Sequence, residues 1–357
     1  MSLHSHTSSS QELLDFIPRL LSRVPLLSQF ERAALRKYKQ VHGTELDYRH
    51  IWWTPPLTAV EAFALERQQI EKLGLRPMVS LSDHDTIEGV WKLQSMESTR
   101  EAVVSVEWSV PTPQQSVLHL GVHNIPPAQA HSIMAMLAGF TAQPEPHRLA
   151  DILAELNSWP ETLVVLNHPY WDEKWIGAEK HAAMVESFAR QYRPFLHALE
   201  LNGLRPWREN LQTVRLGLEL GLPLISGGDR HGLEPNANIN LTNARNFAEF
   251  AQEIRVGRSS DILFLPQYRT SLTLRVIETV CDVLRTNPDH PFGWAHWTDR
   301  VFRRTPDGVR SLSEEWIHGV RPPVIVRLFL ASIRMADCHA VRSAMRVALG
   351  AKEEMVW

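Results

Sequence analysis

The chain has 357 residues, of which 44% are hydrophobic and 22% charged, with a formal net charge of −3 at pH 7. This length allows one large domain with an extension or two domains, and the small negative charge argues against a long nucleic acid as a partner. The two cysteines argue against a disulfide framework, and no apolar run is long enough to cross a membrane. We therefore expect a cytoplasmic protein.

Seven short apolar runs predict β-strands. In chain order they cover residues 3–7, 77–82, 102–109, 116–123, 162–167, 197–202 and 222–227. Between them, the spacing of apolar residues predicts helices over 59–73, 148–157, 178–191 and 207–220. Thr58 is a candidate N-cap for the first of these helices, and Gly221 follows the last. Strands that alternate with helices predict an α/β fold with a mainly parallel sheet, open or closed.

Two segments lie outside this alternation. Residues 13–57, approximately, form an insertion after the first strand, and we expect it to be mostly helical before an aromatic loop at 51–56. Residues 259–357 show no ligand-like spacing and predict a helical C-terminal extension, with the clearest helices at 270–285 and 323–349. We interpret the extension as a packed appendage, with a partner-binding or dimerisation module as the alternative.

Eight side chains of the metal-ligand type lie where predicted strands end. They are His4, His6, His84, Glu107, His119, His168, Asp229 and His231. Imidazole and carboxylate groups are the usual ligands of Zn, Mn and Fe. Strand side chains alternate with period two, so His4 and His6 project to one side, as do Asp229 and His231 if that stretch is extended. Taken singly, His119 and His168 would be interpreted as buried core histidines, and it is the ordered set that favours a metal cluster.

The motifs around these residues resemble those of the PHP family, which is named for polymerase and histidinol phosphatase. The resemblance covers about residues 3–258 and rests on HxHT, SDHDT, VEWS, LHLG, NHP and GGDRHG in this order. It implies a distorted (β/α)7 barrel over residues 1–258 that holds two or three divalent ions (Mn, Fe or Zn). It also implies that the eight side chains are the ligands, with Glu107 as the bridge, and that Asp83 orients a ligand.

The sequence departs from the family pattern in two places. A ligand often found after HxHT would fall near Gln11, a poor metal ligand, so Glu12 or His50 are the candidates to replace it. Ser2 stands where the family usually has Asp.

The function implied is that of a metal-dependent phosphoesterase acting on a small phosphomonoester or nucleotide-like substrate through metal-activated hydroxide. Glu107, His84, His168 and Asp229 are the candidate catalytic residues. Arg205 and Arg208 follow the sixth strand at the start of a helix, where they would bind phosphate or else be ordinary surface charges.

Two other functions remain open. One is an amidohydrolase-type metallohydrolase, although such sites usually use a lysine as the bridge. The other is a non-catalytic, metal-stabilised binding module, in which the insertion and the extension would carry the function.

Overall fold

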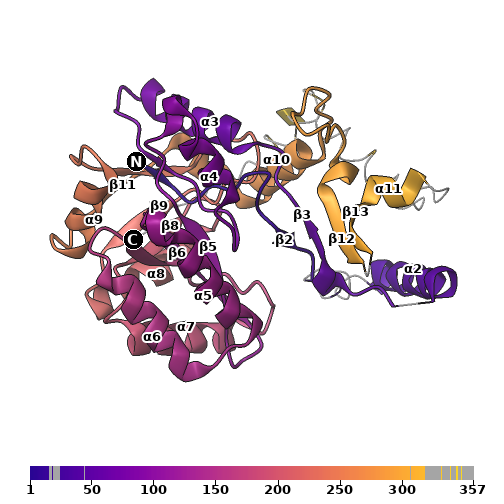
Figure 1. Ribbon diagram of the computed structural model, residues 1–357, viewed down its shortest axis with the longest axis horizontal. Coiled ribbons are helices and arrows are strands. Elements are labelled where there is room, and N and C mark those ends of the chain that lie inside the picture. Colours follow the sequence, from indigo (N-terminus) through magenta and orange to yellow (C-terminus); the bar gives the residue numbers. More distant parts are fainter. Residues whose placement is uncertain are drawn as a thin grey trace.

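A five-stranded sheet forms the centre of the computed structural model, which describes residues 1–15, 25–43, 45–305 and 307–317 and a few isolated positions (Figure 1). In spatial order its strands are β5 (Val106–Pro111), β6 (Val117–His123), β7 (Leu163–Asn167), β8 (Ala198–Asn202) and β9 (Leu224–Gly227). The strands β7, β8 and β9 are parallel, whereas β6 is antiparallel to both of its neighbours. The expectation of a mainly parallel sheet therefore fails at β6. Only residues 112–116 separate β5 from β6, which is too short for a crossover and leaves a hairpin.

A separate parallel pair lies beside this sheet. It consists of β1 (Ser2–Leu3) and β4 (Val79–Ser80). Isolated bridges link it to the sheet, between Ser5 and Arg230 at one edge and between His84 and Glu107 at the other. The mixed α/β class is confirmed, but the ladders of the described residues fall into four sheets and do not close into a regular barrel. β1 and β4 are only two residues long, too short to form continuous ladders with their neighbours.

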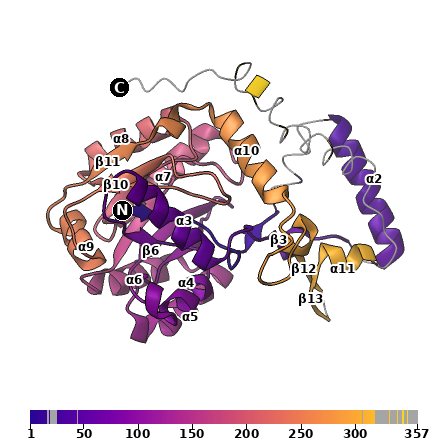
Figure 2. The same ribbon diagram turned by 90° about the horizontal axis from the view of Figure 1, so that it is seen from above.

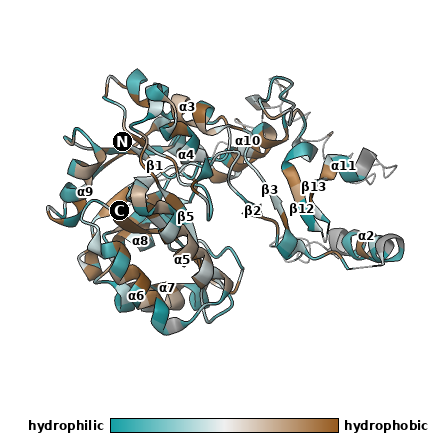
Figure 3. Ribbon diagram, in the orientation of Figure 1, coloured by the Kyte–Doolittle hydropathy of each residue, from teal (hydrophilic) through white to brown (hydrophobic). Residues whose placement is uncertain are grey.

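Helices cover the central sheet, and Figure 3 shows polar residues on their outer surfaces and hydrophobic residues on the strands. They are α3 (Ala59–Lys72), α4 (Glu88–Gln94), α5 (Ala130–Ala142), α6 (Pro146–Ser158), α7 (Ala178–Tyr192) and α8 (Trp207–Leu220). The four helices predicted from the sequence are among them. Thr58 caps α3 through a capping box with Glu61, and Gly221 ends α8 in the left-handed region at φ 61°. Strand residues such as Leu120, Val122 and Leu166 are fully buried beneath this layer.

The chain then continues into a small antiparallel sheet and two further helices. These are β10 (Asn238–Leu241), α9 (Phe247–Arg255), β11 (Asp261–Phe264) and α10 (Leu272–Leu284). Helix α10 matches the prediction for 270–285. Short 3₁₀ turns join other elements, and they are η1 (Tyr48–His50), η2 (Glu97–Thr99), η3 (Pro127–Gln129), η4 (Pro266–Arg269) and η5 (Trp297–Arg300).

The insertion and the C-terminal extension together build a second four-stranded sheet, which we call the accessory sheet. Its order is β13 (Gly308–Ser311), β12 (Val301–Thr305), β3 (Ile51–Trp53) and β2 (Glu12–Leu13), and all its pairings are antiparallel. Helices α2 (Pro25–His42) and α11 (Leu312–Ile317) lie on the same side of the molecule (Figures 1 and 2).

The sequence predicted a helical extension, and this prediction is wrong in part. The extension also contains the strands β11, β12 and β13. The β12–β13 hairpin turns at Gly308, whose φ of 128° favours glycine. The helix expected at 323–349 lies outside the described residues. No helix in the described ranges is both long and apolar enough to cross a membrane.

Candidate metal centre

Glu107 lies at the centre of the histidine cluster. Its side chain projects from β5 and is fully buried. Oε2 of Glu107 lies 2.9 Å from Nε2 of His4, and Oε1 lies 3.0 Å from Nε2 of His168. Oε2 also lies 3.2 Å from Nε2 of His6 and 3.3 Å from Nε2 of His84. One carboxylate thus faces four imidazoles from three segments of the chain, which is the arrangement needed to join neighbouring ions.

The HxH segment presents both of its imidazoles to this centre, as expected. His4 has a positive φ of 63°, and Nδ1 of His4 donates to Oε2 of Glu200 at 2.6 Å. That hydrogen bond turns Nε2 of His4 toward Glu107. The rings of His4 and His6 are 5.1 Å apart.

Asp229 and His231 follow β9 and approach the same segment. Oδ1 of Asp229 lies 3.5 Å from Nε2 of His6 and 3.7 Å from Nε2 of His4. The ring of His231 stacks on His6 with a centroid distance of 4.3 Å. Arg230 lies between them and turns the other way, where it contacts Glu66 at 3.0 Å.

Glu12, rather than His50, completes this side of the cluster. Oε2 of Glu12 lies 3.3 Å from Nε2 of His84, and Oε1 lies 3.5 Å from Nε2 of His231. His50 remains at the surface, where its side chain is 60% exposed and lies 3.7 Å from Asp47. Of the two candidates for the gap near Gln11, only Glu12 is therefore within reach of an ion held by these histidines.

His119 reaches the cluster from a reversed strand. It lies near the start of β6, opposite Asn167 at the end of β7, because β6 runs antiparallel. Nδ1 of His119 lies 3.7 Å from Oε1 of Glu107, and Nε2 lies 3.3 Å from Oε2 of Glu173. The start of β6 and the end of β7 therefore lie at the same end of the sheet.

Asp83 lies outside the cluster and holds the HxHT segment in place. Its Oδ1 accepts from the backbone N–H of Thr7 at 2.5 Å, and its Oδ2 accepts from the Thr7 hydroxyl at 2.7 Å. Asp83 therefore binds the residue that follows His6 in the chain.

Several polar residues at the site were not expected. They are Glu200, Asn202, Asn167 and Glu173. Glu200 lies in the apolar run at 197–202, and a carboxylate in a buried strand is rarely without a partner, so the sequence did contain a signal for this residue. Glu173 is in a loop, where its sequence context carries no such signal. Lys174 joins Oε1 of Glu173 at 2.7 Å to Asp15 at 2.8 Å.

The two arginines proposed for phosphate binding have different surroundings. The guanidinium of Arg205 lies 3.8 Å from the ring centre of Trp171, and its Nη2 lies 3.5 Å from Oδ2 of Asp229. Nε of Arg205 is buried and has no hydrogen-bond partner within the described ranges. Arg208 lies on the exposed side of α8. Only Arg205 is beside the cluster.

The charges of the cluster are strongly coupled. Burial alone would lower the pKa of His4, yet the carboxylates of Glu107 and Glu200 hold it well above its ordinary value. Burial opposes the same effect at His6, whose acidic neighbours raise its pKa to about 10. Although burial raises the pKa of Glu107, the surrounding histidines hold it well below its usual range. Without an ion, protons on His4 and His6 therefore supply the positive charge that these carboxylates require.

These residues fit a set of metal ions. Their candidate ligand atoms form four overlapping groups, each within 4.8 Å: His6, Glu12, His84 and His231; His4, His6 and Asp229; His4, Glu107 and His168; His84, Glu107 and His119. Nε2 of His6 is buried and makes no hydrogen bond to any described residue, although acceptors surround it. An imidazole ligates only in its deprotonated form, so ions bound here would take the place of the protons on His4 and His6.

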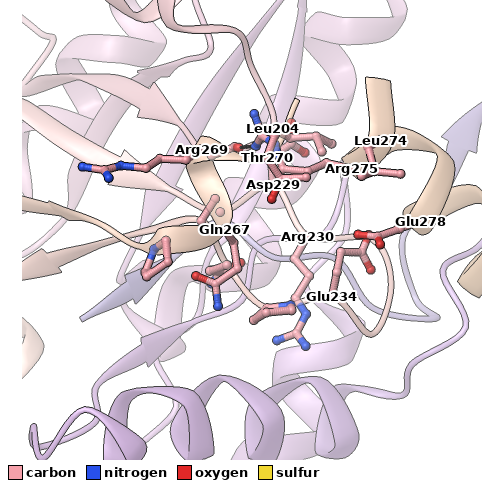
Figure 4. A pocket seen from close by; sticks show the side chains of 16 residues that line it. Leu204, Asp229, Arg230, Glu234, Gln267, Arg269, Thr270, Leu274, Arg275 and Glu278 are labelled. Atoms are coloured by element: carbon pink, nitrogen blue, oxygen red, sulfur yellow. Dashed lines mark hydrogen bonds between the residues drawn. The ribbon is translucent and has the colours of Figure 1, made fainter. Parts of the chain in front are cut away.

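A pocket of about 560 Å³ lies beside the cluster (Figure 4). The residue shared by both is Asp229. The opposite wall comes from η4 and α10 and includes Arg269, Thr270, Arg275 and Glu278. The pocket therefore connects the ends of β8 and β9 with the C-terminal extension.

No protein-family model matches the sequence, and no curated protein matches it. Three solved structures are similar to the chain. A protein from Bifidobacterium adolescentis, provisionally described as a metal-dependent phosphoesterase, is 16% identical, with 58% of this chain and 93% of that chain covered and a TM-score of 0.35. PsfC from Pseudomonas syringae is 15% identical, with coverages of 61% and 88% and a TM-score of 0.39.

The third structure is an amidohydrolase from Chromobacterium violaceum with bound sulfate and no metal. It is 14% identical, with 74% of this chain and 97% of that chain covered and a TM-score of 0.38. These likenesses are remote, so the functional assignment rests on the site itself.

Proposed function

We propose that the protein is a metal-dependent phosphoesterase that hydrolyses a small phosphomonoester or nucleotide-like substrate. The observation that carries this proposal is the convergence of four imidazoles, those of His4, His6, His84 and His168, within 3.3 Å of the Glu107 carboxylate. The motif order of the PHP family supports it, because the eight candidate ligands that the resemblance names all lie in this cluster.

We assign two or three divalent ions of Mn, Fe or Zn to the cluster, as the resemblance implies. His4, Glu107 and His168 would hold one ion, and His6, Glu12 and His231 another. Nε2 of His84 lies 3.3 Å from both Glu12 and Glu107, so it would complete either the second group or a third one with Glu107 and His119. Glu107 belongs to two of these groups, so it would be the bridging carboxylate. Asp229 joins His4 and His6 in a fourth overlapping group.

When bound, divalent ions supply Lewis acidity and make water a stronger nucleophile near neutral pH. The chain's own residues do the rest. Arg205, stacked on Trp171, is placed to donate to phosphate oxygens next to Asp229. The pocket beyond Asp229 has the volume of a small-molecule site, and we assign to it the organic part of the ester.

We also propose that β1, β4 and the five central strands form one distorted seven-stranded barrel over residues 1–258. The bridges Ser5–Arg230 and His84–Glu107 support this, because they join the β1–β4 pair to both edges of the central sheet. Residues 259–357 are assigned to the extension, whose described part supplies β11, α10 and half of the accessory sheet.

Metal analysis combined with a substrate panel tests this function. Protein purified without chelator is expected to hold at least two divalent ions per chain and to release phosphate from nucleotides, sugar phosphates or histidinol phosphate. Less than one ion per chain after loading with Mn, Fe or Zn would overturn the multinuclear centre. Activity on an amide or lactone, with none on any phosphate ester, would overturn the phosphoesterase assignment and leave the metal centre standing.

A further inference from the structure

Glu66 is a fully buried carboxylate outside the histidine cluster. It lies on α3 and is 0% exposed. An unpaired carboxylate in such a position would be strongly unfavourable, so its partners are informative. They come from two segments, residues 2–5 and 230–236, and each of these segments carries a histidine of the cluster.

The first set of partners flanks His4. The hydroxyl of Ser2 donates to Oε2 of Glu66 at 2.7 Å, and the hydroxyl of Ser5 donates to Oε1 at 2.8 Å. His4 lies between these two serines and His6 follows them. These two hydrogen bonds therefore hold the HxH segment against α3, on the side opposite its imidazoles.

The second set flanks Asp229 and His231. Nη1 of Arg230 donates to Oε1 of Glu66 at 3.0 Å, and Nδ2 of Asn236 donates to Oε2 at 2.5 Å. Arg230 also donates to the carbonyl oxygens of Gly232 at 3.0 Å and Leu233 at 2.9 Å. Its guanidinium is thus held on three sides, which fixes the loop that carries the Asp229–His231 pair.

One oxygen of Glu66 joins the two sets. Ser5 and Arg230 form the isolated bridge between the HxH segment and the end of β9, and both donate to Oε1. The register between the HxH segment and the segment after β9 decides whether His4 and His6 face Asp229. A carboxylate that binds both partners of their bridge holds this register.

We propose that Glu66 is the positioning residue of the metal centre. It touches none of the candidate ligand side chains and acts through Ser5 and Arg230, which set the spacing between the HxH pair and the Asp229–His231 pair. The inference rests on the proposed metal centre and is independent of which ester the protein hydrolyses.

Glu66→Gln removes the charge and places an amide N–H against the donor of Asn236, while the shape of the side chain is kept. Outer partners of ligands typically contribute about 10–100-fold to metal affinity, and a loss of that size is expected for Mn²⁺. The absorption bands of the Co²⁺-loaded protein should also shift, because they report ligand geometry. Glu71→Gln on the exposed side of the same helix is the matched control and should change neither quantity.

A purely structural role would lower stability without touching the ions. Leu137→Ala, a cavity variant in the core at α5, provides that comparison. Thermal unfolding of the metal-free proteins measures stability, and competition titration with Mn²⁺ measures affinity. We expect Leu137→Ala to lower the unfolding temperature and to keep the wild-type affinity and Co²⁺ spectrum.

Ser5→Ala is the milder variant if Glu66→Gln does not fold, since it removes one donor and keeps the Glu66–Arg230 pair. It should weaken Mn²⁺ binding in the same direction, several-fold. Wild-type affinity and spectrum in the folded glutamine or alanine variant would overturn the inference alone, as would an equal affinity loss in Leu137→Ala. A wild-type chain that binds no metal would overturn the proposed centre as well.

Discussion

Glu12 lies directly opposite Trp53 in the β2–β3 ladder. The ring of Trp53 is 5.9 Å from that of His231, which is itself within 3.5 Å of the Glu12 carboxylate. The accessory sheet therefore brings both a carboxylate and an aromatic side chain to one side of the cluster. Through β3 and β12 the sheet also connects this side to the C-terminal extension.

Glu12→Ala should remove one ion from the centre, whereas His50→Ala should not. Glu12 is the only carboxylate in the group formed with His6, His84 and His231, and His50 lies at the surface. Metal content by elemental analysis, measured after equilibration at limiting Mn²⁺, is the readout. Equal metal content in both variants would show that water or substrate completes the group.

Glu107→Gln should reduce hydrolysis by at least about 100-fold, because even outer partners of metal ligands contribute about 10–100-fold. The amide keeps the shape of the side chain but removes the negative charge that the surrounding imidazoles share. Turnover on the best phosphate ester is the measurement, with the exposed Glu101→Gln as control. Near-normal turnover would show that Glu107 is not the bridge.

Arg205→Lys should raise KM for the phosphate ester by about tenfold or more, since a lysine loses both the stacking and the forked geometry of a guanidinium. Arg205 is stacked on Trp171 beside Asp229, whereas Arg208 is exposed on α8. Arg208→Lys is therefore the matched control and should leave KM unchanged. If both variants shift KM equally, phosphate binds elsewhere.

Metal affinity should fall as the pH falls. Acidic neighbours outweigh burial at His6 and raise its pKa to about 10, so the metal-free residue keeps its proton at neutral pH. A binding ion must displace that proton, which weakens affinity about tenfold per pH unit for each proton released. Calorimetry in buffers of different ionisation enthalpy counts these protons. Binding of Mn²⁺ with no proton release at pH 7 would contradict the prediction.

The buried His197 should make the metal-free protein sensitive to acid. It accepts a hydrogen bond from the N–H of Val164 at 2.8 Å and donates to Asn157 at 2.8 Å, and burial together with nearby arginines lowers its pKa from 6.5 to about 3. Below pH 6.5 the unfolded chain takes up a proton that the folded chain refuses. The stabilisation is therefore complete above pH 6.5 and is lost toward pH 3, by about 1.4 kcal/mol per pH unit.

His197→Asn keeps an acceptor for Val164 and removes this titration. Its free energy of unfolding should decline less between pH 6 and pH 4 than that of the wild type. Denaturant unfolding of the metal-free proteins gives these energies, and the exposed His147→Asn is the control. An unchanged pH slope in His197→Asn would show that His197 is protonated in the folded protein.

Much of the central fold could be predicted because its strands are short runs of buried apolar residues. All seven predicted strands have counterparts, and α8 begins and ends where the spacing of Trp207 to Leu220 indicates. The apolar run of β6 does not show its direction, since such a run has the same pattern either way; the direction follows from the link at residues 112–116, which is too short for a crossover. His119 nevertheless reaches Glu107, because the hairpin brings the start of β6 to the edge where β7 ends.

The accessory sheet had no local signal. β2 is two residues long and β3 three, so neither shows the alternation of a strand, and β12, the second neighbour of β3, begins only at Val301. The choice between Glu12 and His50 depended on this pairing. Likewise, Arg205 and Arg208 look equivalent in the sequence. They differ in the structure, where Arg205 contacts Trp171 and Asp229 and Arg208 is exposed.

The accessory sheet also has a consequence for how the protein is made. Strand β3 carries the partner of Glu12 but gains its second neighbour only when residues 301–303 have been synthesised. A ribosome-bound chain of residues 1–258 would already contain every histidine of the cluster. It would lack the β12 neighbour that supports β3, so the side of the site that carries Glu12 gains this support only after residues 301–303 have been synthesised.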